Sequence, residues 1–222
     1  MKAKSVVLEH RKINGHKFNL IVKCFCADIT ASQTAYITGI NRNTANRYFH
    51  LFRERIIEAA LVDRAVYSIG NGIEADESYF GPKRVRGKRG RGAGRKIIVL
   101  GLLKRDGRVF TQIIPKANQV EIIPIIRKVV KSGSDIYTDG WRSYNALAVY
   151  GYNHKKVIHE KNEFVNGDSH INGIESFWSW AKARLHKFHG VPKRIFGLYL
   201  LESEWRFNNR ENLEESLRKL DL

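Results

Sequence analysis

Two apolar runs joined by a short polar turn restrict the fold of this chain more than any other feature of its sequence. Residues 97–104 read IIVLGLLK and residues 107–115 read GRVFTQIIP, and both runs are rich in β-branched and other large apolar side chains. The tripeptide RDG at residues 105–107 lies between them and favours a tight turn. The sequence therefore predicts two adjacent antiparallel strands.

The remainder of residues 69–222 alternates between strand and helix patterns. Residues 72–81 (GIEADESYFG), 134–140 (SDIYTDG) and 155–161 (KKVIHEK) are strand candidates. Helical spacing of apolar residues occurs at residues 118–133, 169–190 and 193–210. A hairpin followed by a helix, another strand and closing helices predicts an α/β fold, with a mixed sheet flanked by helices.

The first 68 residues carry helical patterns only, which predicts a small all-α domain at 1–68 before the α/β domain at 69–222. Residues 32–40 form a short helix closed by Gly39, and residues 41–61 form a longer helix capped by Asn41. A short helix, a turn with glycine and a second helix that begins with polar residues is typical of a helix-turn-helix. An ordinary helical hairpin is the alternative. The candidate DNA-reading residues are Arg42, Asn43, Thr44, Asn46 and Arg47.

The charge of the chain favours a polyanionic partner. The sequence has 39 Lys and Arg against 22 Asp and Glu, a net charge of +17, and nucleic acid is the leading candidate. Residues 82–96 (PKRVRGKRGRGAGRK) are expected to form a flexible basic loop. Its candidate phosphate contacts are Arg84, Arg86, Lys88, Arg89 and Arg91.

The sequence also gives expectations about location. No apolar run approaches the ~20 residues that span a bilayer, so no membrane partner is expected. The N-terminus is basic but lacks the apolar stretch of a signal peptide. The two cysteines, Cys24 and Cys26, suit neither a disulfide framework nor a zinc site. We therefore expect a cytoplasmic protein associated with the nucleoid.

Several acidic residues lie where a ligand site is expected. Glu74 and Asp76 project from one face of the strand at 72–81, and Glu77 projects from the other. Asp139 ends a strand, and Glu175 lies in the first turns of a helix. Converging carboxylates suit Mg²⁺ or Mn²⁺, with two ions acting on a phosphodiester. Ordinary surface ion pairs are the alternative.

Four motifs together resemble the DDE transposases of bacterial insertion sequences, in the group related to the eukaryotic Merlin elements. They are EADESYFG, YTDGWRSY, HINGIESFWSWAKARL and EWRFNNR, and the resemblance covers nearly the whole chain. It implies a ribonuclease H-like catalytic domain from about residue 69, after a helix-turn-helix. The family's catalytic positions fall on Asp76, Asp139, Glu175 and Lys182, the three acids being the metal ligands.

The resemblance implies cut-and-paste transposition with Mg²⁺ or Mn²⁺, two ions in all. The partners would be double-stranded DNA, both the terminal inverted repeats and the target, and a homodimer or larger assembly would form on it. A nuclease without strand transfer, or an inactive DNA-binding regulator, is the alternative. Asn172 could fill the third position in place of Glu175, and Glu74 or Glu77 the first. We expect Trp178, in the third motif, to be a core residue.

Overall fold

The computed structural model describes residues 13–66, 70, 72–81, 84–85, 88–89, 96–105, 107–157, 171–220 and 222; of residues 65, 66, 84, 85, 88 and 89 it describes only the backbone. It divides the chain into two compact units. The first unit consists of residues 1–63 and 209–222, and the second of residues 64–208.

The predicted hairpin forms two of the five strands described for the sheet in the second unit. Strand β4 (Ile97–Lys104) pairs antiparallel with β5 (Arg108–Ile114). Gly107 has a φ of +101° in the turn between them, a conformation that glycine adopts without a steric penalty. The tight turn predicted from RDG, between two antiparallel strands, is thereby confirmed.

The complete sheet is mixed. Its strand order among the described residues is β5-β4-β1-β6-β7, built with β1 (Ile73–Phe80), β6 (Asp135–Thr138) and β7 (Asn153–Lys156). β1 runs antiparallel to β4 and parallel to β6, and β6 runs parallel to β7. β7 begins two residues before the predicted strand, and residues 158–161 lie outside the described part of the chain. The prediction of a ribonuclease H-like α/β fold, with a mixed sheet flanked by helices, is confirmed.

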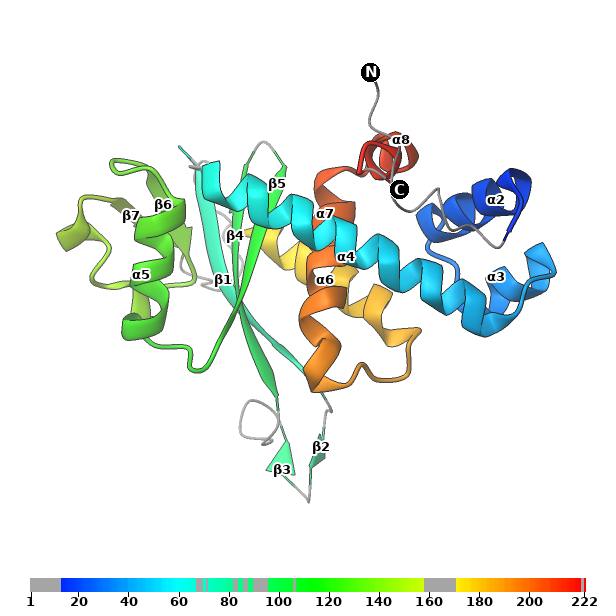
Figure 1. The fold of residues 1–222 in the computed structure, drawn as a ribbon. Coiled ribbons are helices and arrows are strands. Elements are labelled where there is room, and N and C mark those ends of the chain that lie inside the picture. Colours follow the sequence, from blue (N-terminus) through cyan, green and yellow to red (C-terminus); the bar gives the residue numbers. More distant parts are fainter. Residues whose placement is uncertain are drawn as a thin grey trace. The chain divides into compact units, whose positions relative to one another are not determined.

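Helices cover both faces of this sheet (Figure 1). Helix α5 (Gln119–Val129) packs on one face, and α6 (Asn172–His186) and α7 (Phe196–Asn208) pack on the other. Successive side chains of β1 point to opposite faces of the sheet and so contribute to both hydrophobic cores. Ile73 and Ala75 belong to the core under α5, and Phe80 belongs to the core under α6 and α7. Among the described residues of this unit there are also short 3₁₀ turns at Arg142–Tyr144, Ala148–Tyr150 and Lys193–Ile195.

The basic segment is part strand. β2 (Arg84–Val85) pairs antiparallel with β3 (Lys88–Arg89), so the backbone here is not loop throughout. Arg86 and Arg91 lie outside the described residues. The predicted phosphate contacts of this segment therefore stay a prediction.

The first unit is helical. It contains α2 (Gly15–Cys26), α3 (Ala31–Thr38), most of α4 (Arg42–Val66) and α8 (Leu213–Arg218). Thr30 caps α3 in a capping box with Gln33, and Gly39 ends it with a φ of +63°. Asn41 accepts a 2.7 Å hydrogen bond from the backbone N–H of Asn43. The predicted helices and caps on both sides of the turn are thus present, and their identity as a DNA-binding helix-turn-helix stays a prediction.

The end of the chain returns to this first unit. α8 packs against α2, and Arg218 donates a 3.2 Å hydrogen bond to the side chain of Asn19. The sequence assigns residues 209–222 to the second domain because nothing local in them indicates a partner near the N-terminus. In the described part of the chain, no helix combines the length and apolar character needed to cross a bilayer.

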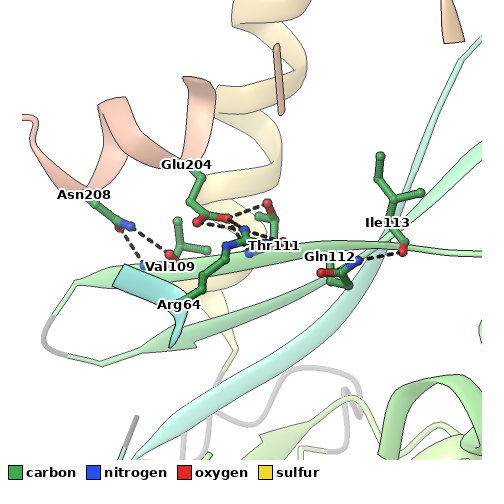
Figure 2. A network of polar contacts seen from close by, with 7 residues as sticks. All are labelled: Arg64, Val109, Thr111, Gln112, Ile113, Glu204 and Asn208. Carbon is green, nitrogen blue, oxygen red and sulfur yellow. Dashed lines mark hydrogen bonds and ion pairs between the residues drawn. The ribbon is translucent and has the colours of Figure 1, made fainter. Parts of the chain in front are cut away.

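Helix α7 covers the outer edge of β5 with polar side chains (Figure 2). Glu204 accepts hydrogen bonds of 2.6 Å from the backbone N–H and from the hydroxyl of Thr111, and Arg64 donates a 2.8 Å bond to the Thr111 carbonyl. Asn208, one turn later, binds both the N–H and the C=O of Val109 at 2.8 Å. Backbone groups that β4 does not pair are therefore satisfied by side chains.

The opposite side of α7 is joined to α6 by a buried ionic network. Glu202 accepts hydrogen bonds from Arg184 of α6 and, at 2.8 Å, from Arg206 of α7. Arg184 also donates a 2.9 Å bond to the hydroxyl of Ser203. All four residues are buried, so each charge depends on its partners for solvation.

Glu202→Ala is expected to lower the free energy of unfolding by about 3–5 kcal/mol, because it leaves two buried guanidinium groups without their carboxylate. Urea unfolding followed by circular dichroism measures this loss. Asp135→Ala is the control, since it removes the half-exposed ion pair with Lys155 and should cost less than about 1 kcal/mol. Equal losses in the two variants would contradict the role given to the network.

Candidate active site

The acidic residues of β1 leave the strand on two faces of the sheet, as predicted. Glu77 accepts a 2.6 Å hydrogen bond from the hydroxyl of Tyr144, which belongs to the core under α5. Glu74 accepts a 2.9 Å bond from the backbone N–H of Ile174 in α6. Asp76 lies on the Glu74 side, where Glu175 and Trp178 of α6 act on its carboxyl group. Glu74 and Glu77, the two alternatives for the first catalytic acid, are thus both hydrogen-bonded to other groups.

Asp139 follows directly after β6, the parallel neighbour of β1. The register pairs Glu74 with Tyr137, and Asp76 and Asp139 each follow two residues later along the chain. One oxygen of Asp139 accepts a 3.0 Å hydrogen bond from the backbone N–H of Trp141. Gly140 lies inside this turn with a φ of +80°. The turn therefore holds the Asp139 carboxyl group at the end of the strand.

Glu175 and Lys182 come from α6, whose apolar side packs on β1 and β4. Glu175 lies in the first turn of the helix, and Lys182 lies two turns later. Both residues are exposed, although the residue before each of them in the helix, Ile174 or Ala181, is buried. The ammonium group of Lys182 lies 5.7 Å from the centre of the Phe80 ring, within the range of a cation–π contact.

Electrostatic interactions with Asp76 link the other predicted acids and the lysine, as the pKa values of Asp76 and Lys182 show. Burial is the largest cause that raises the pKa of Asp76 from 3.8 to about 6, and the charges of Asp139 and Glu175 raise it further. The backbone N–H of Glu77 and the indole of Trp178 work against this rise. Lys182 is exposed, but partial desolvation of its ammonium group still lowers its pKa, against the attraction of Asp76. The structure therefore gathers all four predicted catalytic residues on one side of the sheet.

The carboxylates fit a divalent cation by their chemistry. Asp76, Asp139 and Glu175 supply the hard oxygen donors that Mg²⁺ and Mn²⁺ prefer. Their mutual repulsion, seen in the raised pKa of Asp76, would be relieved by a bound cation. Among the described residues, however, no group of three His, Cys, Asp or Glu side chains is placed so that it could hold a metal ion. The donors are thus near one another but not assembled into one ligand set.

Trp178 reaches the site because β4 has a glycine opposite Asp76. The register pairs Asp76 with Gly101, and a Cβ atom on Gly101 would overlap Cζ2 of Trp178 and lie 2.8 Å from Cδ1 of Ile174. Trp178 is 4% exposed, which confirms the expectation of a core residue. Its indole N–H is near enough to Asp76 to lower the pKa of that residue. Within the described part of the chain, the indole N–H of Trp178 has no partner at hydrogen-bond distance.

The sequence did not indicate Gly101 as part of this site, and it indicated Glu74 only as an alternative first acid, not as the residue that binds the start of α6. An isolated glycine inside an apolar strand indicates a close approach by another element, so IIVLGLLK contained the signal for Gly101. No comparable signal existed for Glu74, because its partner Ile174 is 100 residues away in the sequence.

The candidate DNA-reading residues lie in the first two turns of α4. Arg42, Asn43, Asn46 and Arg47 are exposed, and Thr44 is half-buried. The apolar side of the same helix is buried through Ala45, Phe49, Phe52 and Ile56. The polar side of α4 is thus accessible in the first unit.

Comparisons with known proteins agree on one family. The model of the ISXO2-like transposase domain matches residues 69–208. An uncharacterized transposase-like protein of Haemophilus influenzae is 45% identical over 104 residues, which cover 47% of this chain and 84% of that protein. An uncharacterized protein in transposable element ISH50 of Halobacterium salinarum is 33% identical over 126 residues; these cover 54% of this chain and 42% of that protein.

A solved structure of a pre-cleavage Mos1 transpososome is also similar. The match covers 96% of this chain and 80% of that chain at 12% identity. Its TM-score of 0.34 is too low to bear on the fold.

The metal-free protein should lose stability relative to Asp76→Asn as the pH rises from about 4 to about 6. The pKa of Asp76 is about 6 in the folded chain against an ordinary 3.8. The folded state therefore binds the proton more tightly in this window, and ionisation above it disfavours folding. We expect a relative loss on the order of 1–2 kcal/mol, allowing for the part of the carboxyl group that water reaches. Thermal unfolding in chelator at several pH values measures it.

Asp135→Asn is the control for this experiment, because Lys155 lowers the pKa of Asp135. The wild-type protein should then gain stability relative to that variant as the pH rises through the lowered pKa and up to the ordinary one. A difference between wild type and Asp76→Asn that does not change with pH would contradict the electrostatic account of the site.

Proposed function

This chain belongs to the ISXO2-like transposase family, and on that premise we propose that it binds the ends of its element and catalyses metal-dependent DNA strand cleavage and strand transfer. Membership confirms the expectation of an insertion-sequence transposase, and the relation to Merlin elements stays a prediction. The observation that carries the proposal is the coupling of Asp76 to Asp139, Glu175 and Lys182 on one side of the sheet.

Asp76, Asp139 and Glu175 are the residues that would hold Mg²⁺ or Mn²⁺. Such ions, when bound, polarise a phosphodiester and lower the pKa of an attacking water or hydroxyl group. The chain itself supplies the positions of the three carboxylates on two strands and a helix. The Asx turn at Asp139 and the packing of α6 on β1 and β4 limit how far these side chains move apart.

Lys182 supplies the positive charge in this proposal. Its ammonium group lies on the same side of α6 as Glu175 and is attracted by Asp76. An ammonium group there can donate a hydrogen bond to a phosphate oxygen of the scissile strand. The Phe80 ring, whose centre lies 5.7 Å from this ammonium group, gives the side chain a cation–π contact.

DNA recognition is assigned to two segments. The exposed polar start of α4 would contact base edges in the terminal repeats, and the basic segment at β2 and β3 would contact phosphates. Two element ends have to be joined, so a homodimer or larger assembly on DNA is part of the proposal. The net charge of +17 supports a polyanionic partner in general.

Asp76→Asn, Asp139→Asn and Glu175→Gln should each reduce strand cleavage at least about 1000-fold while specific DNA binding stays within about threefold, because each removes a donor of the metal site. The assay uses labelled DNA that ends in the repeats flanking the element, with Mg²⁺ or Mn²⁺, followed by joining to a second duplex. Asp135→Asn, at the start of the strand that precedes Asp139 and outside the site, is the control and should cleave normally. Wild-type cleavage without joining would indicate a nuclease, and binding without cleavage a regulator.

Arg42→Ala and Arg47→Ala should each weaken binding to the terminal repeat by about 1–3 kcal/mol and bring it closer to binding of random DNA. Fluorescence anisotropy with both duplexes measures the ratio. Lys219→Ala removes an exposed charge of the same unit and should change both affinities by equal, small amounts. Loss of affinity in equal measure on both duplexes for Arg42→Ala would make the helix a phosphate contact.

A further inference from the structure

The helix that carries Glu175 and Lys182 begins without a capping side chain of its own. Its N-cap residue is Ile171, whose side chain makes no capping hydrogen bond. The first N–H groups of a helix have no partner within the helix and need one elsewhere. At Ile174, the third residue of α6, that partner is Glu74 of β1, whose Oε2 accepts the bond at 2.9 Å.

Glu74 is a buried carboxylate with few options for movement. It is 1% exposed, and the guanidinium of Arg105 lies 3.4 Å from its other oxygen. Arg105 in turn lies 3.7 Å from the centre of the Tyr137 ring. A negative charge at the start of α6 is also favoured by the helix dipole. The side chain is thus held between a cation on one side and a helix terminus on the other.

Gly173 makes this contact sterically accessible. A Cβ atom at Gly173 would lie 2.8 Å from Oε2 of Glu74 and 3.0 Å from Cδ2 of Leu103. Any other residue would therefore displace either the Glu74 carboxylate or the first turn of α6, and would disturb the contact between them. The glycine and the glutamate together determine how closely the helix start approaches the strand.

This contact lies beside both parts of the candidate site. Glu74 and Asp76 are two residues apart on the same face of β1, and Ile174 directly precedes Glu175 in α6. The hydrogen bond from Ile174 to Glu74 therefore sets where the backbone of Glu175 lies relative to Asp76. Two carboxylates that bind the same metal ion have to lie at a fixed separation, so metal binding is sensitive to such a displacement.

We infer that Glu74 is a positioning residue, which holds the start of α6 against β1 so that Glu175 meets Asp76 at the metal site. The inference rests on the proposed function and adds a residue that does not contact DNA or metal. A helix cap with a purely structural role would change stability alone. A positioning residue also changes metal affinity and the rate of cleavage at saturating DNA.

The experiment compares Glu74→Ala, Glu74→Gln and Gly173→Ala with a matched control. Glu204→Ala is that control, because Glu204 is also a buried carboxylate that binds a backbone N–H and an arginine in the same unit, at the β5 edge of the sheet (Figure 2). It should reduce stability as Glu74→Ala does, without changing the geometry at α6.

Three quantities are measured well below the unfolding temperature of each variant. They are hydrogen exchange at the Ile174 amide, Mn²⁺ affinity by calorimetry, and the single-turnover cleavage rate at saturating DNA. For Glu74→Ala we expect exchange at least about tenfold faster, and Mn²⁺ affinity and cleavage reduced about 10–100-fold with DNA affinity unchanged. Glu74→Gln keeps an acceptor oxygen and should lie within about fivefold of wild type in all three.

Gly173→Ala should reproduce the defect of Glu74→Ala, and it serves as the test if Glu74→Ala does not fold. Wild-type Mn²⁺ affinity in Glu74→Ala or Gly173→Ala, with Ile174 exchange accelerated, would overturn the inference and leave a structural cap. The same loss in Glu204→Ala would also overturn it. If wild type binds Mn²⁺ but cleaves no DNA, the proposed function fails, and the inference is then decided by Mn²⁺ affinity and exchange.

Discussion

The close approach of α6 to the paired strands β1 and β4 is the constraint on which the candidate site depends. Asp76 lies on a strand, whereas Glu175 and Lys182 lie on the helix, so the helix-to-sheet distance sets how far apart these groups are. Two glycines permit that distance, Gly101 under the Trp178 ring and Gly173 beside Glu74. The carboxylates repel one another, and the apolar packing of α6 opposes that repulsion.

Buried charges join the elements of the second unit to one another. Glu74 of β1, which also binds the start of α6, pairs with Arg105 after β4. Glu202 of α7 pairs with Arg184 of α6, and Glu204 of α7, which also binds β5, pairs with Arg64 of α4. Each pair links two different elements. Apolar contacts tolerate sliding of a helix, whereas a buried ion pair loses much of its energy when its partners separate. These pairs therefore fix the registration of α6 and α7 on the sheet.

The sequence was most informative where the structure is set by local patterns. The hairpin, the helix ends at Gly39 and Asn41, and the two faces of β1 all follow from turn chemistry and periodicity. The capping of α6 could not be predicted in this way, because the local residue is Ile171 and the acceptor lies in β1. The return of residues 209–222 to the first unit likewise depends on contacts with α2 that no local pattern indicates.

The side chains along β5 have a consequence for how copies of this chain can meet. A sheet edge with unpaired backbone groups can accept a strand from a second molecule, and Glu204 and Asn208 of α7 already occupy those groups on β5. The other edge, β7, is four residues long and carries Lys155 and Lys156. The repulsion between molecules of charge +17 opposes their association in free solution. A polyanion that neutralises this charge removes the repulsion. On such a partner, the occupied edge of β5 still prevents one sheet from extending into the next.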